Sequence, residues 1–233
     1  MEAIVLCGGF GTRMEPIGLF FPKALLPIKG RAVLDYILED LESSDSIERI
    51  VISTNKKFAE QFKNYVKYKS LVMKKPMQIV VEPTMKDGEK FGAIKGLSYA
   101  IKSSGICSDV IVILGDNFYD FDLQVLFDHF KVTRKAIVAL YDIKSEEEAK
   151  KYGVVKLEGD KIVEFEEKPA HPKSTLISTG IYLFRREDLP KLDLYLSENK
   201  DTDAVGKFIK WYIAREETEG VKFHGDYNRW YDI

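Results

Sequence analysis

The sequence has few of the side chains that most often carry metal or nucleophilic chemistry. It holds 2 cysteines and 3 histidines among 233 residues. Cys7 and Cys107 are far apart and each is at or beside an apolar segment, so we expect two reduced, buried side chains, with neither a disulfide nor a zinc site. The histidines have no cysteine or paired carboxylate at ligand spacing, so we expect them on the surface or in loops: His129, His171 and His224. Any chemistry that the protein performs must therefore depend on other side chains.

The sequence also lacks long apolar runs and an excess of one charge. The 35 Lys and Arg side chains nearly balance the 37 Asp and Glu, and no basic stripe is interleaved with aromatics, so we expect no nucleic-acid partner. No run approaches the roughly 20 apolar residues that span a bilayer. Residues 1–6 are too short and too acidic for a signal peptide, so we expect a cytoplasmic protein with no membrane partner.

What is present is an alternation of apolar runs and amphipathic patterns in the first 141 residues. Short runs rich in Val and Ile predict strands buried on both faces, at residues 3–6, 50–53, 78–81, 110–114 and 137–140. Apolar side chains at helical spacing predict helices between them, at residues 33–41, 58–66 and 93–101. This order predicts βαβ units, and hence an α/β fold with a mostly parallel sheet.

The pattern changes after about residue 141. Two apolar segments, 154–157 and 162–165, flank the turn Glu158-Gly159-Asp160 and predict a β-hairpin. A further strand is expected at 176–184, a helix at 204–216 and a last short strand at 221–224. With 45% hydrophobic residues, the chain can bury the core of one large domain whose second part is a smaller β-rich sub-lobe.

A glycine-rich segment follows the first predicted strand. Its three glycines would allow successive backbone N–H groups to face an anion, and they precede two polar side chains: Gly8, Gly9, Gly11, Thr12 and Arg13. We interpret this segment as a triphosphate-binding loop. A dinucleotide-binding loop would need glycine at Met14, and the Gly-Lys-Ser/Thr ending of a P-loop is missing.

Two charged residues are placed where chemistry is expected. Lys23 is flanked by Pro22 and, four residues on, by Pro27 in an apolar segment, which predicts a positioned cation able to share phosphoryl charge with Arg13. Asp116 follows the buried run 110–114 after one glycine, so its carboxylate should stand at the carboxyl end of a strand, where Mg²⁺ could bridge it to phosphates. By itself, Asp116 would suit an Asx turn equally well.

Several motifs in order give the sequence a family resemblance. The motifs are GGFGTRMEP, PKALLPI, ILGDN, YGVV, EEKP, STGIY and the final WYDI. Together they resemble those of the sugar-1-phosphate nucleotidyltransferases, especially the glucose-1-phosphate thymidylyltransferases. The resemblance covers nearly the whole chain. The resemblance implies a three-layer α/β/α, Rossmann-like (GT-A-like) fold. It also implies a nucleotide-binding part at about 1–141, and a sugar-binding part with a C-terminal metal-ligand strand at about 142–233.

The resemblance implies a role for each motif. It makes Arg13, Lys23 and Asp116 catalytic, and pairs Asp116 with Asp232 as ligands of Mg²⁺. It assigns the nucleotide to Leu6, Gly8, Gly9, Gly11, Thr12, Arg13, Glu82, Pro83 and Gly88. It assigns the sugar phosphate to Gly153, Glu167, Lys168, Thr179 and Gly180.

The implied reaction joins a nucleoside triphosphate, with dTTP or UTP favoured, to a sugar 1-phosphate, with glucose 1-phosphate favoured. Two alternatives are a mannose-1-phosphate guanylyltransferase or other nucleotidyltransferase, and a catalytically silent regulatory subunit that binds nucleotide-sugars. The segment 82–93 departs from the family, with Glu82 where the thymidylyltransferases tend to have Gln. Family members often form dimers or tetramers. The sequence lacks the C-terminal β-helix of some relatives, so we expect no acyltransferase activity.

Overall fold

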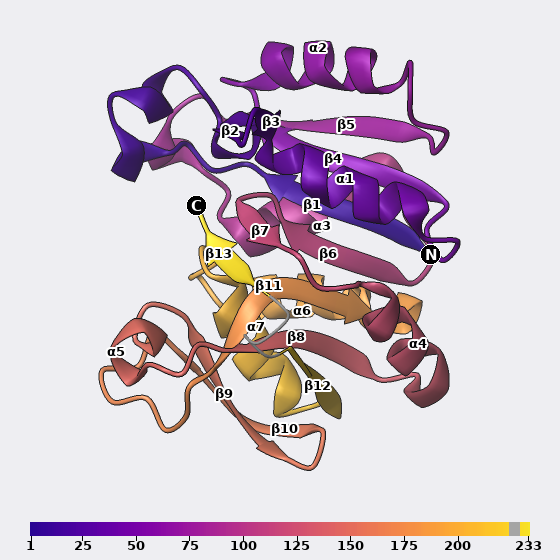
Figure 1. The fold of residues 1–233 in the computed structure, drawn as a ribbon. Helices are drawn as coiled ribbons and strands as arrows, with labels where there is room; N and C mark the ends of the chain where they lie inside the picture. The colour runs from indigo at the N-terminus through magenta and orange to yellow at the C-terminus, as the bar shows by residue number, and fades with distance from the viewer. Residues whose placement is uncertain (224–228) are drawn as a thin grey trace.

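The computed structural model describes residues 1–223 and 229–233, with the side chain of Arg13 also outside the described part. A nine-stranded sheet, in the order β5-β4-β1-β6-β11-β8-β12-β10-β9, lies between two layers of helices (Figure 1). Its first four strands are parallel: β5 (Met77–Glu82), β4 (Arg49–Asn55), β1 (Glu2–Cys7) and β6 (Val110–Leu114). The predicted three-layer α/β/α architecture is confirmed.

The other half of the sheet mixes strand directions. β11 (Leu176–Phe184) lies antiparallel between β6 and β8 (Ala136–Asp142), and β12 (Thr218–Phe223) runs parallel to β8. The predicted hairpin is formed by β9 (Gly153–Glu158) and β10 (Lys161–Glu167). β9 also pairs with β11 at Ile177 and Val154, so the hairpin curls back onto the sheet. Since only β10 and β11 run against the other strands, the sheet is mostly parallel in direction.

Helices cover both faces because the strands are apolar on both sides. On β1, Ala3 and Val5 pack into one core and Ile4 into the other. The first core is covered by α1 (Val33–Ser43), α2 (Ala59–Lys69) and α4 (Gln124–Thr133). The second is covered by α3 (Ala93–Ser104), α6 (Pro190–Glu198) and α7 (Val205–Ile213). The two halves are also joined at the start of α3, where Ile94 N donates to Thr202 O at 3.1 Å.

Short elements complete the fold beside the strand ends. β13 (Trp230–Asp232) pairs antiparallel with β7 (Asn117–Tyr119), which directly follows β6. β2 (Pro27–Ile28) pairs with β3 (Arg31–Ala32). The remaining helical turns are short: α5 (Glu146–Ala149), η1 (Thr12–Met14), η2 (Ile17–Leu19), η3 (Lys23–Leu25), η4 (Asp87–Glu89) and η5 (Arg186–Asp188).

Most expected elements are present, with some differences. The expectation that both cysteines are buried is wrong for Cys107, which is exposed because it lies between the end of α3 and the start of β6. The last helix begins at Val205 and ends at Ile213, three residues before the predicted end. His129 is partly buried against Glu219, with 2.7 Å between Nε2 and Oε2. His224 lies outside the described residues.

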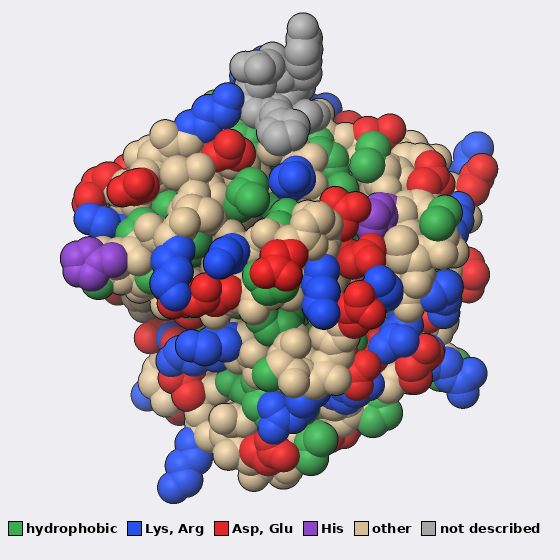
Figure 2. Space-filling model, turned by 90° about the horizontal axis from the view of Figure 1, so that it is seen from below, with side chains coloured by type: hydrophobic (Ala, Val, Ile, Leu, Met, Phe, Trp, Pro, Cys, Tyr) green, Lys and Arg blue, Asp and Glu red, His purple; other side chains and the backbone are tan. Residues whose placement is uncertain are grey.

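Two observations describe the outside of the molecule. On the face seen from below, Lys and Arg side chains are interspersed with Asp and Glu (Figure 2). Across residues 1–223 and 229–233, no helix combines the length and the apolar character that crossing a bilayer requires.

Candidate active site

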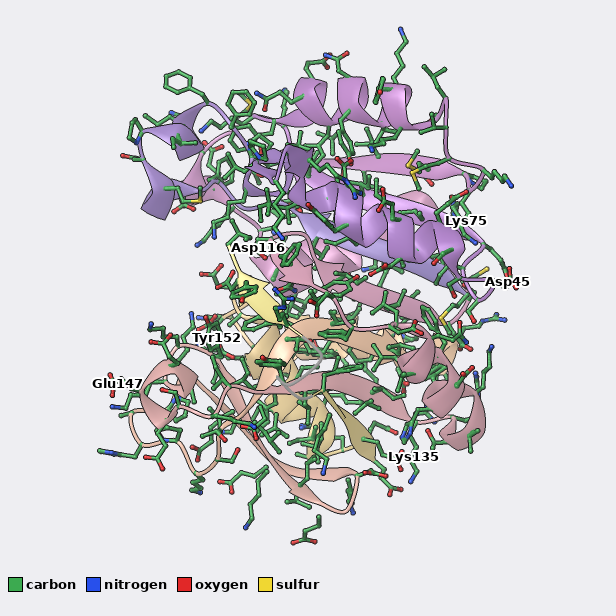
Figure 3. All side chains as sticks on the ribbon, in the orientation of Figure 1. Asp45, Lys75, Asp116, Lys135, Glu147 and Tyr152 are labelled. Atoms are coloured by element: carbon green, nitrogen blue, oxygen red, sulfur yellow. The ribbon has the colours of Figure 1, made fainter. Side chains whose placement is uncertain are left out.

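A cavity of about 590 Å³ opens at the carboxyl ends of the central strands. Figure 3 shows Asp116 and Tyr152 on this side of the molecule, whereas Asp45 and Lys75 lie at the opposite ends of the strands. The wall contains most of the residues that the sequence singled out: Leu6, Gly8, Gly9, Gly11, Thr12, Lys23, Glu82, Asp116, Gly153, Glu167, Lys168, Thr179, Gly180 and Asp232. Parallel strands therefore bring these distant motifs to one edge of the sheet.

The glycine-rich loop is held from behind by β4. Asn55 Nδ2 donates a hydrogen bond to Gly8 O at 3.1 Å. Gly9 lines the cavity and has open space where a Cβ would stand. Gly11 adopts φ 66° and packs against the backbone of Gly18, an arrangement that favours glycine at both positions. The loop thus presents an unobstructed backbone to a ligand.

Lys23 is held in place rather than free in solvent. It opens η3 directly after Pro22, whose extended backbone (φ −70°, ψ 140°) sets the entry to the turn. Lys23 Nζ lies 3.5 Å from Asp116 Oδ2 and donates a hydrogen bond to the backbone oxygen of Ile233. Its side chain is only 20% exposed. The expected positioned cation is present, whereas the side chain of Arg13 lies outside the described part of the structure.

The pairing of β7 with β13 brings the two aspartates together. Asp232 lies opposite Asn117 in this ladder, and Ile233 N donates to Asp116 O at 3.1 Å. Trp230 anchors the strand, since its Nε1 lies 3.2 Å from Asn117 Oδ1 and 3.1 Å from Thr179 O. Both aspartates consequently lie on one wall of the cavity.

The acidic groups suit a metal that needs few protein ligands. Among the described residues, no group of three or more His, Cys, Asp or Glu side chains is arranged to hold a metal ion. Mg²⁺ is commonly held by one or two carboxylates, together with water and substrate phosphates. Asp116 and Asp232 beside the glycine-rich loop match that donor set. The burial of Tyr152 and the nearby Asp232 raise the pKa of the Tyr152 hydroxyl.

Glu82 marks one end of the cavity. It ends β5, and its carboxyl group is buried, which raises its pKa, while a hydrogen bond from Ser53 opposes this shift. Pro83 and Gly88 are exposed and lie outside the cavity wall. The same loop contributes Asp87 and Lys90 to the wall instead, and Lys90 Nζ lies 3.0 Å from Asp203 Oδ2 across the cavity mouth.

Glu167 marks the other end. Burial raises the pKa of its carboxyl group, against the opposing charges of Lys168 and Lys207. Lys168 has φ 48°, a left-handed conformation that is costly for a residue with a Cβ, and its N–H donates to Tyr152 O at 3.0 Å. A Cβ at Gly206 would clash with the Glu167 carboxylate. Close packing against Gly206 therefore holds the Glu167 carboxylate, and the hydrogen bond to Tyr152 holds the backbone of Lys168.

Two residues assigned to the sugar phosphate contact other parts of the protein. The Thr179 hydroxyl donates to Ala139 O at 2.9 Å, so its proton is already used. Gly180 adopts φ 80°, and a Cβ there would stand 2.7 Å from Leu114 Cδ1 and 2.9 Å from Asn117 Nδ2. Gly180 is thus required by packing as well as by any ligand that approaches it.

The cavity wall contains residues that sequence reasoning missed: Asn117, Tyr152, Ser178, Asp203 and Gly206. Asn117 is the most informative, because its Oδ1 accepts from Trp230 while its buried Nδ2 has no partner among the described residues. Asn117, Tyr152 and Ser178 lie within the motifs of the family resemblance, which could have pointed to them. Asp203 and Gly206 had no local signal.

Comparison with known proteins gives relatives with a common activity. The chain is 33% identical over 83% of its length to a protein provisionally described as a mannose-1-phosphate guanyltransferase of Sulfolobus acidocaldarius. It is 33% identical over 80% of its length to the D-glycero-alpha-D-manno-heptose 1-phosphate guanylyltransferase of Campylobacter jejuni, covering 77% of that protein. The chain spans about half the length of several curated relatives that it matches, including 51% of the Sulfolobus protein.

A solved structure is similar over the whole chain. It is a protein of Bacillus anthracis, provisionally described as a glucose-1-phosphate thymidylyltransferase and solved in complex with sucrose. The TM-score is 0.84 at 25% identity, covering 100% of this chain and 89% of that one. The family model for nucleotidyl transferases matches residues 2–233, and the chain therefore belongs to that family.

Proposed function

We propose that this protein transfers a nucleoside monophosphate from a nucleoside triphosphate to a sugar 1-phosphate, giving a nucleotide-sugar and pyrophosphate. The observation that carries this proposal is the meeting of Asp116, Asp232 and Lys23 beside the glycine-rich loop in one cavity. Positive charge, paired carboxylates and an unobstructed backbone are the parts that phosphoryl transfer needs. The names of the relatives support the same substrate classes.

The chemistry makes no demand for a general base. A phosphate monoester has a second pKa of about 6, so the attacking oxygen of a sugar 1-phosphate is largely ionised at neutral pH. The protein's task is then to align this oxygen with the α-phosphorus, opposite the departing pyrophosphate, and to offset negative charge. Lys23 would stabilise the α-phosphoryl group. The glycine-rich loop and Arg13 would hold the leaving phosphates.

Asp116 and Asp232 would hold Mg²⁺. When bound, the ion would neutralise phosphate charge and help to orient the triphosphate. The ion pair between Lys23 and Asp116 keeps the lysine beside the same carboxylate. Lys23 is thereby positioned beside the proposed metal site.

The two ends of the cavity suit different substrates. Residues 1–141 contribute the glycine-rich loop and Glu82, which we assign to the nucleotide. Residues 142–233 contribute Gly153, Glu167 and Lys168, which we assign to the sugar phosphate, with Glu167 accepting from sugar hydroxyls and Lys168 facing the phosphate. The family resemblance favours dTTP or UTP with glucose 1-phosphate, whereas two curated relatives are named guanylyltransferases.

A substrate panel tests the proposal. Purified protein with Mg²⁺ should release pyrophosphate when one of GTP, dTTP, UTP, ATP or CTP is combined with glucose 1-phosphate or mannose 1-phosphate. Release should require both substrates and should stop in excess chelator. Asp116→Asn should abolish release, while Asp160→Asn, in the exposed hairpin turn, should leave it intact.

A catalytically silent nucleotide-sugar sensor is the rival from another class. A sensor would bind a nucleotide-sugar without turnover of any pair in the panel. The retention of Lys23 and both aspartates in one cavity favours the enzyme. Robust turnover in excess chelator, or no turnover with any pair, would contradict the proposed reaction.

A further inference from the structure

Glu82 is a buried acid that the proposed phosphoryl chemistry does not use. Its side chain ends β5 in the cavity wall, and the residue is 5% exposed. Among the described residues, no Lys, Arg or His lies within ion-pair distance of its carboxylate. The Ser53 hydroxyl donates a hydrogen bond to this carboxylate, 3.3 Å from Oε1. A buried carboxylate with a single hydroxyl partner retains most of its acceptor capacity.

The carboxylate of Glu82 occupies space that is free because two neighbouring residues are glycines. A Cβ built at either Gly8 or Gly96 would stand 2.8 Å from Glu82 Oε1. Gly8 is in the glycine-rich loop and Gly96 is in the second turn of α3, so backbone flanks the carboxylate on two sides. Because Gly8 belongs to the proposed triphosphate site, Glu82 stands beside the place where a nucleotide would enter the cavity.

Hydrogen-bonding chemistry decides which base would satisfy such a group. An ionised carboxylate only accepts, and two parallel N–H donors match its two oxygens. Guanine presents two adjacent donors, N1–H and the 2-amino group. Thymine and uracil present one N–H between two carbonyl oxygens, which a carboxylate would repel. Adenine and cytosine place an amino group beside an accepting ring nitrogen.

We propose that Glu82 makes the cavity select guanine nucleotides, by accepting hydrogen bonds from N1–H and the 2-amino group of the base. This inference rests on the proposed function, because it names the nucleotide that the same site takes. It also replaces dTTP and UTP, which the family resemblance favours, by GTP. The replacement follows from Glu82 itself, since glutamine at this position would offer one donor and one acceptor instead.

The test compares kcat/KM for GTP, ITP, UTP and dTTP with one sugar 1-phosphate. ITP is the decisive probe, because it differs from GTP only by the missing 2-amino group. We expect the wild-type protein to favour GTP over ITP by about 10-fold or more, the effect of one hydrogen bond to a charged group. Glu82→Gln should bring the GTP/ITP ratio towards one and raise UTP and dTTP relative to GTP.

Glu89→Gln is the matched control. Glu89 belongs to the same loop and undergoes the same chemical change, but it is exposed and outside the cavity wall. Its Oε2 accepts from Met85 N at 3.2 Å. The GTP/ITP ratio of this variant should equal that of the wild type, and circular dichroism should show that both variants are folded.

Each outcome decides one proposal. Equal use of GTP and ITP, a wild-type preference for dTTP or UTP, or an unchanged base order in Glu82→Gln would each overturn the guanine inference alone. Absence of turnover with every pair would overturn the proposed function. Binding would still test Glu82 in that case: GDP should raise Tm more than IDP or UDP does in the wild type, and this difference should vanish in Glu82→Gln.

Discussion

Each end of the cavity has a buried glutamate at the end of a strand, beside two glycines, but the two strands belong to different parts of the sheet. At the nucleotide end, Glu82 ends a parallel strand and is flanked by Gly8 and Gly96. At the sugar end, Glu167 ends the antiparallel hairpin, and Gly153 and Gly206 leave it room. Burial raises the pKa of both carboxyl groups. Each end therefore holds a poorly solvated acceptor in a space that only glycines leave free.

The difference between the two ends lies in what surrounds each acid. The Ser53 hydroxyl donates a hydrogen bond to Glu82, whereas the charges of Lys168 and Lys207 act on Glu167. A carboxylate near cations tolerates ligands with several hydroxyl groups, such as sugars, without depending on them for charge balance. A carboxylate without a cation depends more on its ligand, which favours strict selection by paired N–H donors. The two acids should accordingly respond differently to mutation.

The largest effect should come from Lys23, which lies between the two ends. We expect Lys23→Ala to lower kcat by about 10²- to 10³-fold for every substrate pair, because it removes preorganised charge from the reacting phosphate. Tm should change little, since Lys23 packs into neither core. Pyrophosphate release and thermal unfolding measure the two quantities. Lys63→Ala, at an exposed position of α2, is the control. An effect confined to the KM of one substrate would contradict the proposed action of Lys23 on the reacting phosphate.

The second largest effect should come from Asp232. Asp232→Asn keeps the size of the side chain but removes a charge from the proposed metal site. We therefore expect kcat/KM to fall by about 10²-fold and the Mg²⁺ concentration that gives half the maximal rate to rise. A magnesium titration of pyrophosphate release measures both. If the variant kept the wild-type Mg²⁺ dependence, Asp232 would not be a ligand.

Two glycine variants should separate the ends of the cavity. Gly8→Ala places a methyl group against Glu82, and Gly206→Ala places one against Glu167. We expect the first to raise KM for the triphosphate by about 10-fold and the second to raise KM for the sugar phosphate similarly. Steady-state kinetics with each substrate varied in turn distinguish them, and each variant's unaffected KM is its own control. Equal changes in both KM values would remove the distinction between the ends.

The smallest effect concerns stability. An acid whose folded pKa is raised destabilises the fold above that pKa, and this cost disappears as the pH falls below it. Glu82→Gln and Glu167→Gln should therefore raise Tm at pH 7, by about 2 °C each, and the gain should shrink towards pH 4. We expect the larger gain for Glu82, because no described Lys, Arg or His side chain pairs with it, whereas the charges of Lys168 and Lys207 act on Glu167. Thermal unfolding between pH 4 and 8 measures this, and a gain that grew on acidification would contradict the assigned cause.

The buried acid Asp188, which forms ion pairs, should show the opposite dependence of stability on pH. Although burial by itself raises the pKa of Asp188, hydrogen bonds from Arg185 and Lys191 hold it below its usual value. Asp188→Asn should thus destabilise the protein at pH 7, and the wild type should lose this stabilisation as the pH falls through the lowered pKa. The comparison distinguishes a buried acid held in ion pairs from Glu82 and Glu167, which form no ion pair within the described part of the chain.

Much of the framework could be predicted from local sequence. Residues 110–114 and 176–184 were expected as strands and form β6 and β11 with the same bounds. A strand buried on both faces has a continuous apolar run, and its carboxyl end is followed by the glycine-rich loop or by Asp116, so strand and motif positions follow from adjacency along the chain. The sequence predicts the hairpin because its turn residues lie between two short apolar segments.

Apart from the motifs that the family resemblance already groups into one site, only the tertiary structure decided which of these pieces meet. It inserted β11 between β6 and β8, brought Asp232 to Asp116 through β13, and placed Gly96 and Gly206 against the buried glutamates. Periodicity and turn chemistry describe neighbours along the chain, so they determined the elements and the positions of the motifs. Contacts between distant residues depend on how both helical layers pack against one sheet, and no local pattern contains that information.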